Sequence, residues 1–180
     1  MLVLKYHLSE EEYFDYNYYT SWTAPDKKKY RVGYYLKVLL LYAAIAGLYI
    51  FSRRDQFLTM DLVIFGSIGL LYIVLVPFLV RQSVQRRVRQ ILSHPENKHI
   101  LEEAEVVLSD TGITDKDPES ESRYTWEAIV KKAETKSSYL LYTNTYHAIV
   151  IPKRVLKSTE DRKELERLLN EHLPLSTEMT

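Results

Sequence analysis

Histidine is the side chain in this sequence best suited to bind a metal ion or to move a proton near neutral pH. Two histidines on one helical face bind a metal together when they are four residues apart, as in the His-Glu-x-x-His pattern. No pair here has that spacing; the five histidines are His7, His94, His99, His147 and His172. The sequence therefore predicts no local metal site, and only a site assembled from distant residues stays open.

Patterns for covalent catalysis and phosphate binding are also missing from the sequence. It contains no cysteine, which excludes a thiol nucleophile, a thiolate metal site and a disulfide framework. Its 5 glycines form neither a phosphate-binding loop nor a Gly-x-Ser-x-Gly turn. Glutamates cluster at residues 10–12 and 102–105, where they are most simply solvated helix ends rather than an acid and base pair. We therefore expect no enzymatic activity, no cofactor and no metal.

Basic side chains offer a different chemistry, the binding of anionic ligands or lipid head groups. Lys153 and Arg154 follow a predicted strand and are one candidate contact, although exposed charges at a strand end are the simpler interpretation. A second candidate follows the second apolar stretch and consists of Arg86, Arg87 and Arg89. Each such cation contributes about 1 kcal/mol near an anionic membrane surface. The same charges also orient membrane helices.

Two long apolar stretches must position these basic groups. Residues 34–52 contain a single charge, Lys37, near their start, and residues 62–80 contain none. About 20 mostly apolar residues span a bilayer. A helix buried in a soluble protein usually keeps a polar stripe, which neither stretch has. The sequence therefore predicts transmembrane helices at about 34–52 and 61–80, joined as a hairpin by a short connector.

Small residues suggest where the two helices touch. Ala43 and Gly47 lie four residues apart on one face of the first helix, whereas Gly66 and Gly69 lie three apart on one face of the second. Small side chains let helix backbones approach closely in lipid, and these four lie at matching depths in an antiparallel pair. We expect Gly47 to lie near Gly66 and Ala43 near Gly69. The alternative is that the small residues are scattered and mark no contact.

The distribution of Lys and Arg predicts the orientation of this hairpin. Five such residues lie between residues 26 and 37, five between 81 and 99, and only two in the connector. Because cytoplasmic flanks carry the excess of Lys and Arg, both termini are expected in the cytoplasm. Aromatic residues also fit two membrane-interface belts, an inner one of Tyr30, Tyr34 and Tyr35 and an outer one of Tyr49, Phe51 and Phe57.

The hairpin separates two cytoplasmic pieces. Residues 1–25 are rich in aromatic side chains and predict a helix capped by Ser9, with Glu12 completing a capping box. Residues 26–93 are the hairpin with a helical extension into the cytoplasm. Residues 94–180 form a C-terminal domain, whose part from residue 102 onward carries 16 acidic and 11 basic side chains. That balance argues against nucleic acid as a partner.

The C-terminal domain changes from helical to strand-like patterns. Turn residues and β-branched or aromatic runs predict short strands at about 105–108, 112–114, 124–130, 139–143 and 146–151. A helix capped by Ser158 follows, with leucines along one face. The sequence thus predicts an α+β membrane protein in which one helix closes an antiparallel sheet or barrel.

Three features of this domain resemble the YcxB-like family of bacterial membrane proteins. They are the segment Tyr124-Thr-Trp-Glu-Ala-Ile, the strand ending Ile149-Val-Ile-Pro-Lys-Arg, and the leucine-rich final helix. Members of that family pair two membrane helices with a C-terminal domain of pleckstrin-homology type. The resemblance implies this fold and a location in the bacterial cell membrane, but it brings no established activity.

Two functions fit these expectations. The first is a non-enzymatic, multi-pass membrane protein whose cytoplasmic domain binds a protein partner or a lipid head group near the inner leaflet. The second is a subunit of a small oligomeric transporter or pore, which needs several copies because two helices cannot enclose a pathway. The bilayer itself is the one partner that the sequence predicts; it does not identify a further partner or an oligomeric state.

Overall fold

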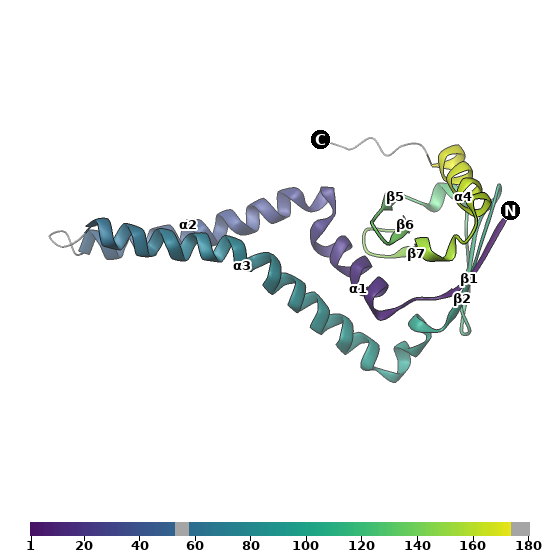
Figure 1. Ribbon diagram of the computed structural model, residues 1–180, viewed down its shortest axis with the longest axis horizontal. Coiled ribbons are helices and arrows are strands. Elements are labelled where there is room, and N and C mark those ends of the chain that lie inside the picture. Colours follow the sequence, from purple (N-terminus) through teal and green to yellow (C-terminus); the bar gives the residue numbers. More distant parts are fainter. Residues whose placement is uncertain (53–57, 174–180) are drawn as a thin grey trace. The chain divides into compact units, whose positions relative to one another are not determined.

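The computed structural model describes residues 1–52 and 58–173 of the chain (Figure 1). The chain divides into two compact units. The first, here called the sheet domain, combines Met1–Asn17 with Val88–Thr180; the second, the helical unit, is Tyr18–Arg87. The helical unit is therefore an insertion between two parts of one domain.

The helical unit consists mainly of two long helices. A π-helical turn, Tyr19–Thr23, and a 3₁₀ turn, Pro25–Lys27, lead into α2, Lys28–Ser52. The second long helix, α3, is Leu58–Ser93 and passes through Pro77 without ending; its residues from Val88 onward belong to the sheet domain. Both helices are long and apolar enough to cross a membrane, as the sequence predicts, and α3 continues beyond its apolar part. Most of the expected connector, and Phe57 of the expected outer belt, lie outside the described residues.

Aromatic side chains form the contact between α2 and α3. Tyr42 donates a hydrogen bond from its hydroxyl to the carbonyl oxygen of Phe65 at 2.9 Å. The ring centroids of Tyr42 and Tyr49 lie 6.0 and 5.5 Å from that of Phe65, and Tyr35 lies 6.3 Å from Tyr72. Because Tyr35, Tyr42 and Tyr49 recur every seven residues, they share one face of α2. Later residues of α2 pair with earlier residues of α3, so the two helices are antiparallel.

The predicted seam of small residues is wrong, and the aromatic contact takes its place. Ala43, Gly47 and Gly66 are exposed, and a Cβ atom added to either glycine would meet nothing within 4 Å. Gly69 alone faces the other helix, where an added Cβ would lie 3.7 Å from the Tyr42 ring. The tyrosines reach across the gap between the helices, so close backbone approach at the other small residues is not required.

The first sheet of the sheet domain has four antiparallel strands in the order β1-β2-β3-β4. They are β1 Leu2–His7, β2 Glu103–Ser109, β3 Gly112–Lys116 and β4 Glu121–Tyr124. The expected Asp-Thr-Gly turn connects β2 and β3 in a hairpin. Gly112 is required there because its φ is +151° and an added Cβ would collide with the Tyr124 carbonyl.

The second sheet has three antiparallel strands in the order β5-β6-β7. They are β5 Lys131–Glu134, β6 Ser138–Tyr142 and β7 Ala148–Pro152. Every residue of β6 and β7 is buried, which is typical of strands covered on both faces. A single strand was expected over 124–130; instead β4 ends at Tyr124 and residues 126–128 form a 3₁₀ turn. The turn is favoured because the Trp126 indole is buried and donates to Ser109 O at 2.9 Å.

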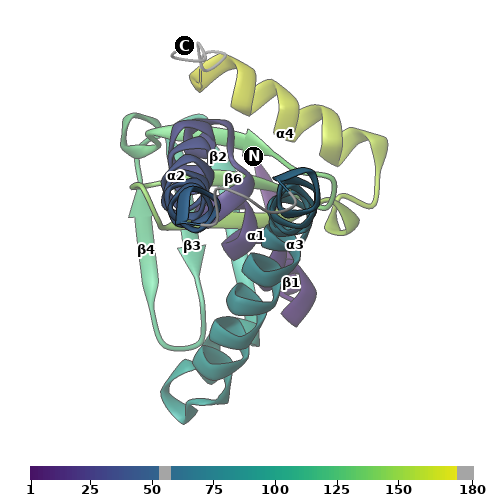
Figure 2. The same cartoon turned by 90° about the vertical axis from the view of Figure 1, so that its left-hand side faces the viewer.

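The last helix, α4, is Thr159–His172 and lies along one side of the strands (Figure 2). Its capping box joins Ser158 and Asp161, as the sequence predicts in part from Ser158. Leucines on its buried face join both sheets in one core; the most buried are Leu165 and Leu168. Among the described residues the two sheets stay separate, so the fold is α+β without a closed barrel.

The N-terminal residues differ most from expectation. The capping box of Ser9 and Glu12 is confirmed, and it starts α1, Glu10–Tyr18. The preceding six residues, however, form β1, which pairs with β2 from His7 opposite Glu103 to Leu2 opposite Leu108. The expected separate N-terminal piece, residues 1–25, is therefore divided: Met1–Asn17 completes the sheet domain, and the rest belongs to the helical unit.

Candidate functional site

Lys153 and Arg154 both bind other parts of the sheet domain. They lie in a 3₁₀ turn, Lys153–Val155, directly after β7. Lys153 Nζ is 2.6 Å from Glu134 Oε1 and lies 5.2 Å above the ring of Tyr139. Arg154 donates from Nε and Nη2 to the two carboxylate oxygens of Glu12, at 2.7 and 2.9 Å. Both side chains are therefore already paired with carboxylates of the sheet domain.

The Arg154 pair anchors the N-terminal part of the chain. Glu12 is only 8% exposed, although it carries a charge. Burial alone would raise the pKa of Glu12, but hydrogen bonds from Arg154 and Ser9 outweigh burial and hold that pKa below its ordinary value. The two-pronged geometry of a guanidinium on a carboxylate is strong and directional. The pair therefore fixes α1 at the end of β7, 142 residues along the chain.

Two tyrosine hydroxyls continue this attachment along β7. Tyr6 donates to Val150 O at 2.5 Å, and burial raises the pKa of Tyr6, so the hydroxyl keeps its proton. Tyr16 donates to Tyr146 O and also interacts with the backbone N–H of Ala148. Since β7 pairs with β6 on one side only, Val150 O and the Ala148 N–H are polar groups of a strand at the edge of its sheet, and the two hydroxyls satisfy them.

The arginines on α3 have a different environment. Arg86, Arg87 and Arg89 are all exposed on one continuous helix, a few residues after its apolar part. Arg86 and Arg89 are one turn apart, so their side chains are neighbours on the helix surface. With the part of the chain that the structure describes, none of the three forms a hydrogen bond or ion pair. Of the basic candidates, these three are the ones that have no carboxylate partner among the described residues.

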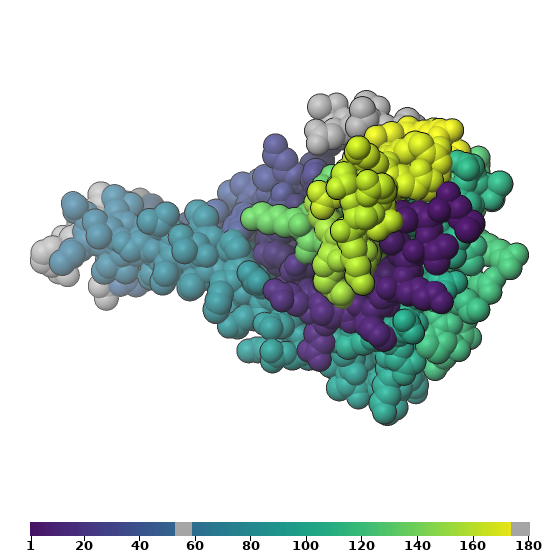
Figure 3. All heavy atoms as spheres, turned by 45° about the vertical axis from the view of Figure 1, so that its right-hand side comes forward, coloured from purple at the N-terminus to yellow at the C-terminus, as the bar shows by residue number. Residues whose placement is uncertain are grey.

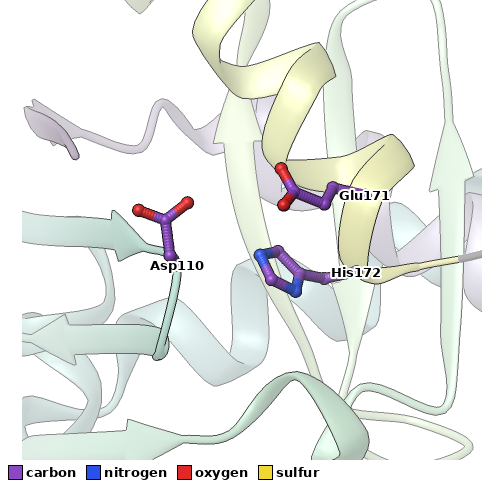
Figure 4. Close-up of side chains that lie close together, drawn as sticks. All are labelled: Asp110, Glu171 and His172. Atoms are coloured by element: carbon purple, nitrogen blue, oxygen red, sulfur yellow. The ribbon is translucent and has the colours of Figure 1, made fainter.

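A further cluster holds a histidine and two carboxylates. Asp110, Glu171 and His172 offer ligand atoms within 4.8 Å of one another (Figure 4). Arg167 already binds both carboxylates, with 3.0 Å to Asp110 and 2.6 Å to Glu171. The His172 ring stacks on Trp126, with centroids 4.9 Å apart. A guanidinium thus supplies the positive charge here, and the contacts join α4 to the β2–β3 turn.

The strands and α4 that carry these contacts can be compared with known proteins. Residues 108–169 match the family model described as YcxB-like protein. The match runs from the end of β2 into α4, and this part of the chain is called the YcxB-like region below. It contains Lys153 and Arg154 but not Glu12, β1 or the two long helices. No curated protein and no solved structure gave a significant match.

The N-terminal partners of this region were missed by the sequence reasoning. Leu2, Leu4 and Tyr6 alternate with exposed residues and are buried in the core, which is the pattern of a half-buried strand. That alternation was the available signal for β1. No local spacing could have paired Glu12 with Arg154, because the two residues meet only through the fold.

Proposed function

We propose that this protein is a non-enzymatic integral membrane protein that presents a pleckstrin-homology-like interaction module at the cytoplasmic face of a bacterial cell membrane. The module is the sheet domain, and it binds a protein partner or a lipid head group near the inner leaflet. Two antiparallel sheets followed by a C-terminal helix, with a YcxB-like region inside them, are compatible with this type of module.

One observation carries the membrane part of the proposal: outside their aromatic seam, α2 and α3 expose long runs of apolar side chains. A soluble protein rarely leaves a continuous apolar patch larger than a few hundred Å² in water. Exposed members along the two helices include Leu40, Leu41, Ile45, Leu48, Leu62, Val63, Ile68, Leu70, Leu71, Val74, Phe78 and Leu79. A lipid bilayer is the solvent that this surface requires.

Strand pairing supports the expected topology. Because β1 and β2 form one sheet, Leu2–His7 and Glu103–Ser109 must lie on the same side of any membrane. The inserted helices must then cross the bilayer twice, or not at all. The excess of Lys and Arg on the two outer flanks favours the cytoplasm as the side that holds the sheet domain.

Head-group contact is best assigned to Arg86, Arg87 and Arg89. They are exposed and follow the apolar part of α3, where an anionic head group would lie. Lys153 and Arg154 are instead engaged with Glu134 and Glu12. Each exposed arginine near an anionic surface contributes about 1 kcal/mol, so three together favour anionic over neutral lipid.

The topology can be tested with single cysteines, because the chain has none of its own. Met60→Cys places a thiol at the connector end of α3, and Val130→Cys places one on the sheet domain; both positions are exposed. In intact cells, a membrane-impermeant maleimide should label Met60→Cys at once and Val130→Cys only after lysis. Labelling of Val130→Cys from outside contradicts a cytoplasmic domain, and recovery of the chain in the soluble fraction contradicts the membrane proposal.

The head-group assignment needs a separate measurement on the full chain in nanodiscs. Energy transfer from tryptophan to dansyl-phosphatidylserine should exceed that to dansyl-phosphatidylcholine. Replacing Arg86, Arg87 and Arg89 by glutamine should abolish the difference, whereas Lys153→Gln should leave it unchanged because Lys153 faces Glu134. An unchanged preference in the triple variant would assign lipid recognition to another surface.

A further inference from the structure

The sheet domain takes its first strand from a distant part of the sequence. Residues 1–17, here called the N-terminal strap, provide β1 and most of α1. The other strands of the first sheet follow one another between residues 103 and 124, whereas β1 is separated from them by the whole helical unit. Figure 3 shows the strap in purple, lying across the domain surface between α4 and the strands.

The strap binds β2 in the way that an added peptide strand binds a sheet edge. Six residue pairs align in antiparallel register, so backbone hydrogen bonds hold the strand along its length. Leu2, Leu4 and Tyr6 enter the core, and the residues between them face outward. Backbone pairing together with pockets for alternate side chains is the general chemistry of strand addition.

Polar groups fasten the strap at its other end. The bidentate pair of Glu12 and Arg154 attaches it to the turn after β7, the Tyr6 hydroxyl attaches it to β7, and the Tyr16 hydroxyl attaches it to the loop before β7. These bonds are directional and few, in contrast to the extensive apolar contacts of a core. A change at one of them should loosen the strap without removing buried leucines from the domain.

The strap adds Leu2, Leu4 and Tyr6 to a core whose deepest side chains lie elsewhere in the domain. The domain's most deeply buried side chains belong to β2, β3, β6, β7 and α4: Leu108, Ile113, Leu140, Leu141, Ile151, Leu165 and Leu168. The YcxB-like region, residues 108–169, likewise contains none of the strap. Release of the strap would uncover one strand edge, that of β2, and the apolar positions that Leu2, Leu4 and Tyr6 now fill.

We propose that the edge of β2 is the strand-accepting surface of this domain and that the strap occupies it as an internal ligand. When the strap is released, the edge takes an extended peptide segment of a partner protein that carries apolar side chains at alternate positions. This inference rests on the proposed function as an interaction module and names the class of partner that the module binds.

A peptide with the sequence of residues 1–17, fluorescently labelled, is a suitable probe for the full-length protein in detergent. Glu12→Gln in the protein weakens its own strap but leaves Arg154 and β2 intact, so a peptide that retains Glu12 can compete. We expect the peptide to bind this variant about tenfold more tightly than the unaltered chain. A peptide with Leu4 and Tyr6 replaced by serine should not bind, because it lacks the alternating apolar side chains.

A disulfide lock supplies the matched control. Val3 and Val107 are directly opposite in the β1–β2 register, and the chain has no other thiol, so Val3→Cys with Val107→Cys can tie the strap down on oxidation. Peptide binding in the Glu12→Gln background should disappear when the lock is oxidised and return when it is reduced. If Glu12→Gln does not fold, Tyr16→Phe loosens the strap by removing one hydroxyl.

Two results would overturn the proposal. Absence of peptide binding in every loosened variant means that the edge accepts no strand in trans, and binding that persists in the oxidised lock means that the peptide uses another surface. Neither result depends on membrane insertion or orientation, which the cysteine labelling tests separately.

Discussion

The two units of this protein place the same amino acid in opposite environments. Leu165 in the sheet domain is 0% exposed, whereas Leu71 in the helical unit is 56% exposed and its neighbour Leu70 is 66% exposed. In the domain, leucine leaves water by packing against other side chains. In the helical unit more than half of the leucine surface stays uncovered, and in the proposed membrane location this surface leaves water by entering lipid. This difference in exposure is what the proposed membrane location of the helical unit predicts.

The contacts inside each unit follow the same division. In the sheet domain, apolar residues from both sheets and α4 form one core, and ion pairs connect its surface elements. Between α2 and α3 the contact depends on rings and on the Tyr42 hydroxyl. In lipid, burial of apolar surface gives helices no reason to associate, so shape and hydrogen bonding must supply the association.

The largest expected effect comes from placing charge where the comparison predicts lipid. Leu71→Arg together with Val74→Arg introduces two cations on the exposed part of α3, each costing about 2.5–3.5 kcal/mol near the centre of a membrane helix. Insertion should fall sharply in a translocation assay that reports the fraction of chains spanning the membrane. Gln85→Arg, on the same helix beyond the apolar part, is the control and should insert normally. Equal insertion of both would break the comparison.

The next effect compares one substitution in both units. Leu165→Ala should destabilise the sheet domain by about 2–5 kcal/mol, because it leaves a cavity in the shared core. Leu71→Ala removes the same atoms from an exposed position and should change domain stability by less than about 0.5 kcal/mol. Denaturant unfolding of the full chain in a Trp22→Phe background, followed by the fluorescence of Trp126, measures both. A large effect of Leu71→Ala would contradict the contrast between the two units.

The features that the sequence predicted are those that depend on residues close together in the chain. Uninterrupted apolar stretches indicated α2 and α3, Ser158 and a leucine stripe indicated α4, and an Asp-Thr-Gly turn indicated the β2–β3 hairpin. The sequence also placed Arg86, Arg87 and Arg89 after the apolar stretch of α3, where the structure has them exposed. In each case the helix period, a cap or a turn determines the structure locally.

The features missed by the sequence depend on contacts between distant residues. β1 finds its partner about a hundred residues away, and the strong capping box beside it drew the prediction toward a helix. The sequence offered Arg154 as a contact for an anionic ligand. In the structure Arg154 pairs with Glu12, which lies near the other end of the chain. The aromatic seam was missed because tyrosines in membrane helices also fit interface belts, and small residues offered a competing face.

A smaller effect tests the buried pair that closes the sheet domain. Glu12→Gln should destabilise the domain by about 1–3 kcal/mol at neutral pH, since Arg154 loses its charged partner. The pKa of Glu12 lies below its ordinary value in the folded domain, so the pair stabilises above the ordinary carboxyl pKa and is lost as pH falls through the folded one. The difference in unfolding free energy between the variant and the unaltered chain should therefore shrink between pH 7 and pH 3.

Glu134→Gln is the matched control for this pH series. It removes the negative charge of Glu134, the exposed partner of Lys153. Exposed ion pairs contribute only about 0–1 kcal/mol. The other carboxylates titrate alike in all three chains, so their effects cancel in the differences. A pH-independent loss in Glu12→Gln would mean that packing, rather than charge, holds the N-terminal strap.

The smallest expected effect distinguishes the aromatic seam from the seam of small residues. Tyr42→Phe removes the hydroxyl that binds Phe65 O and should weaken the α2–α3 pair by about 0.6 kcal/mol, a typical value for a hydrogen bond between membrane helices. Gly69→Leu should weaken it further, because the larger side chain meets the Tyr42 ring. Gly47→Leu should have no effect, because its added Cβ meets nothing within 4 Å. Reversible unfolding in mixed detergent measures all three, and a greater loss from Gly47→Leu than from Gly69→Leu would restore the seam of small residues.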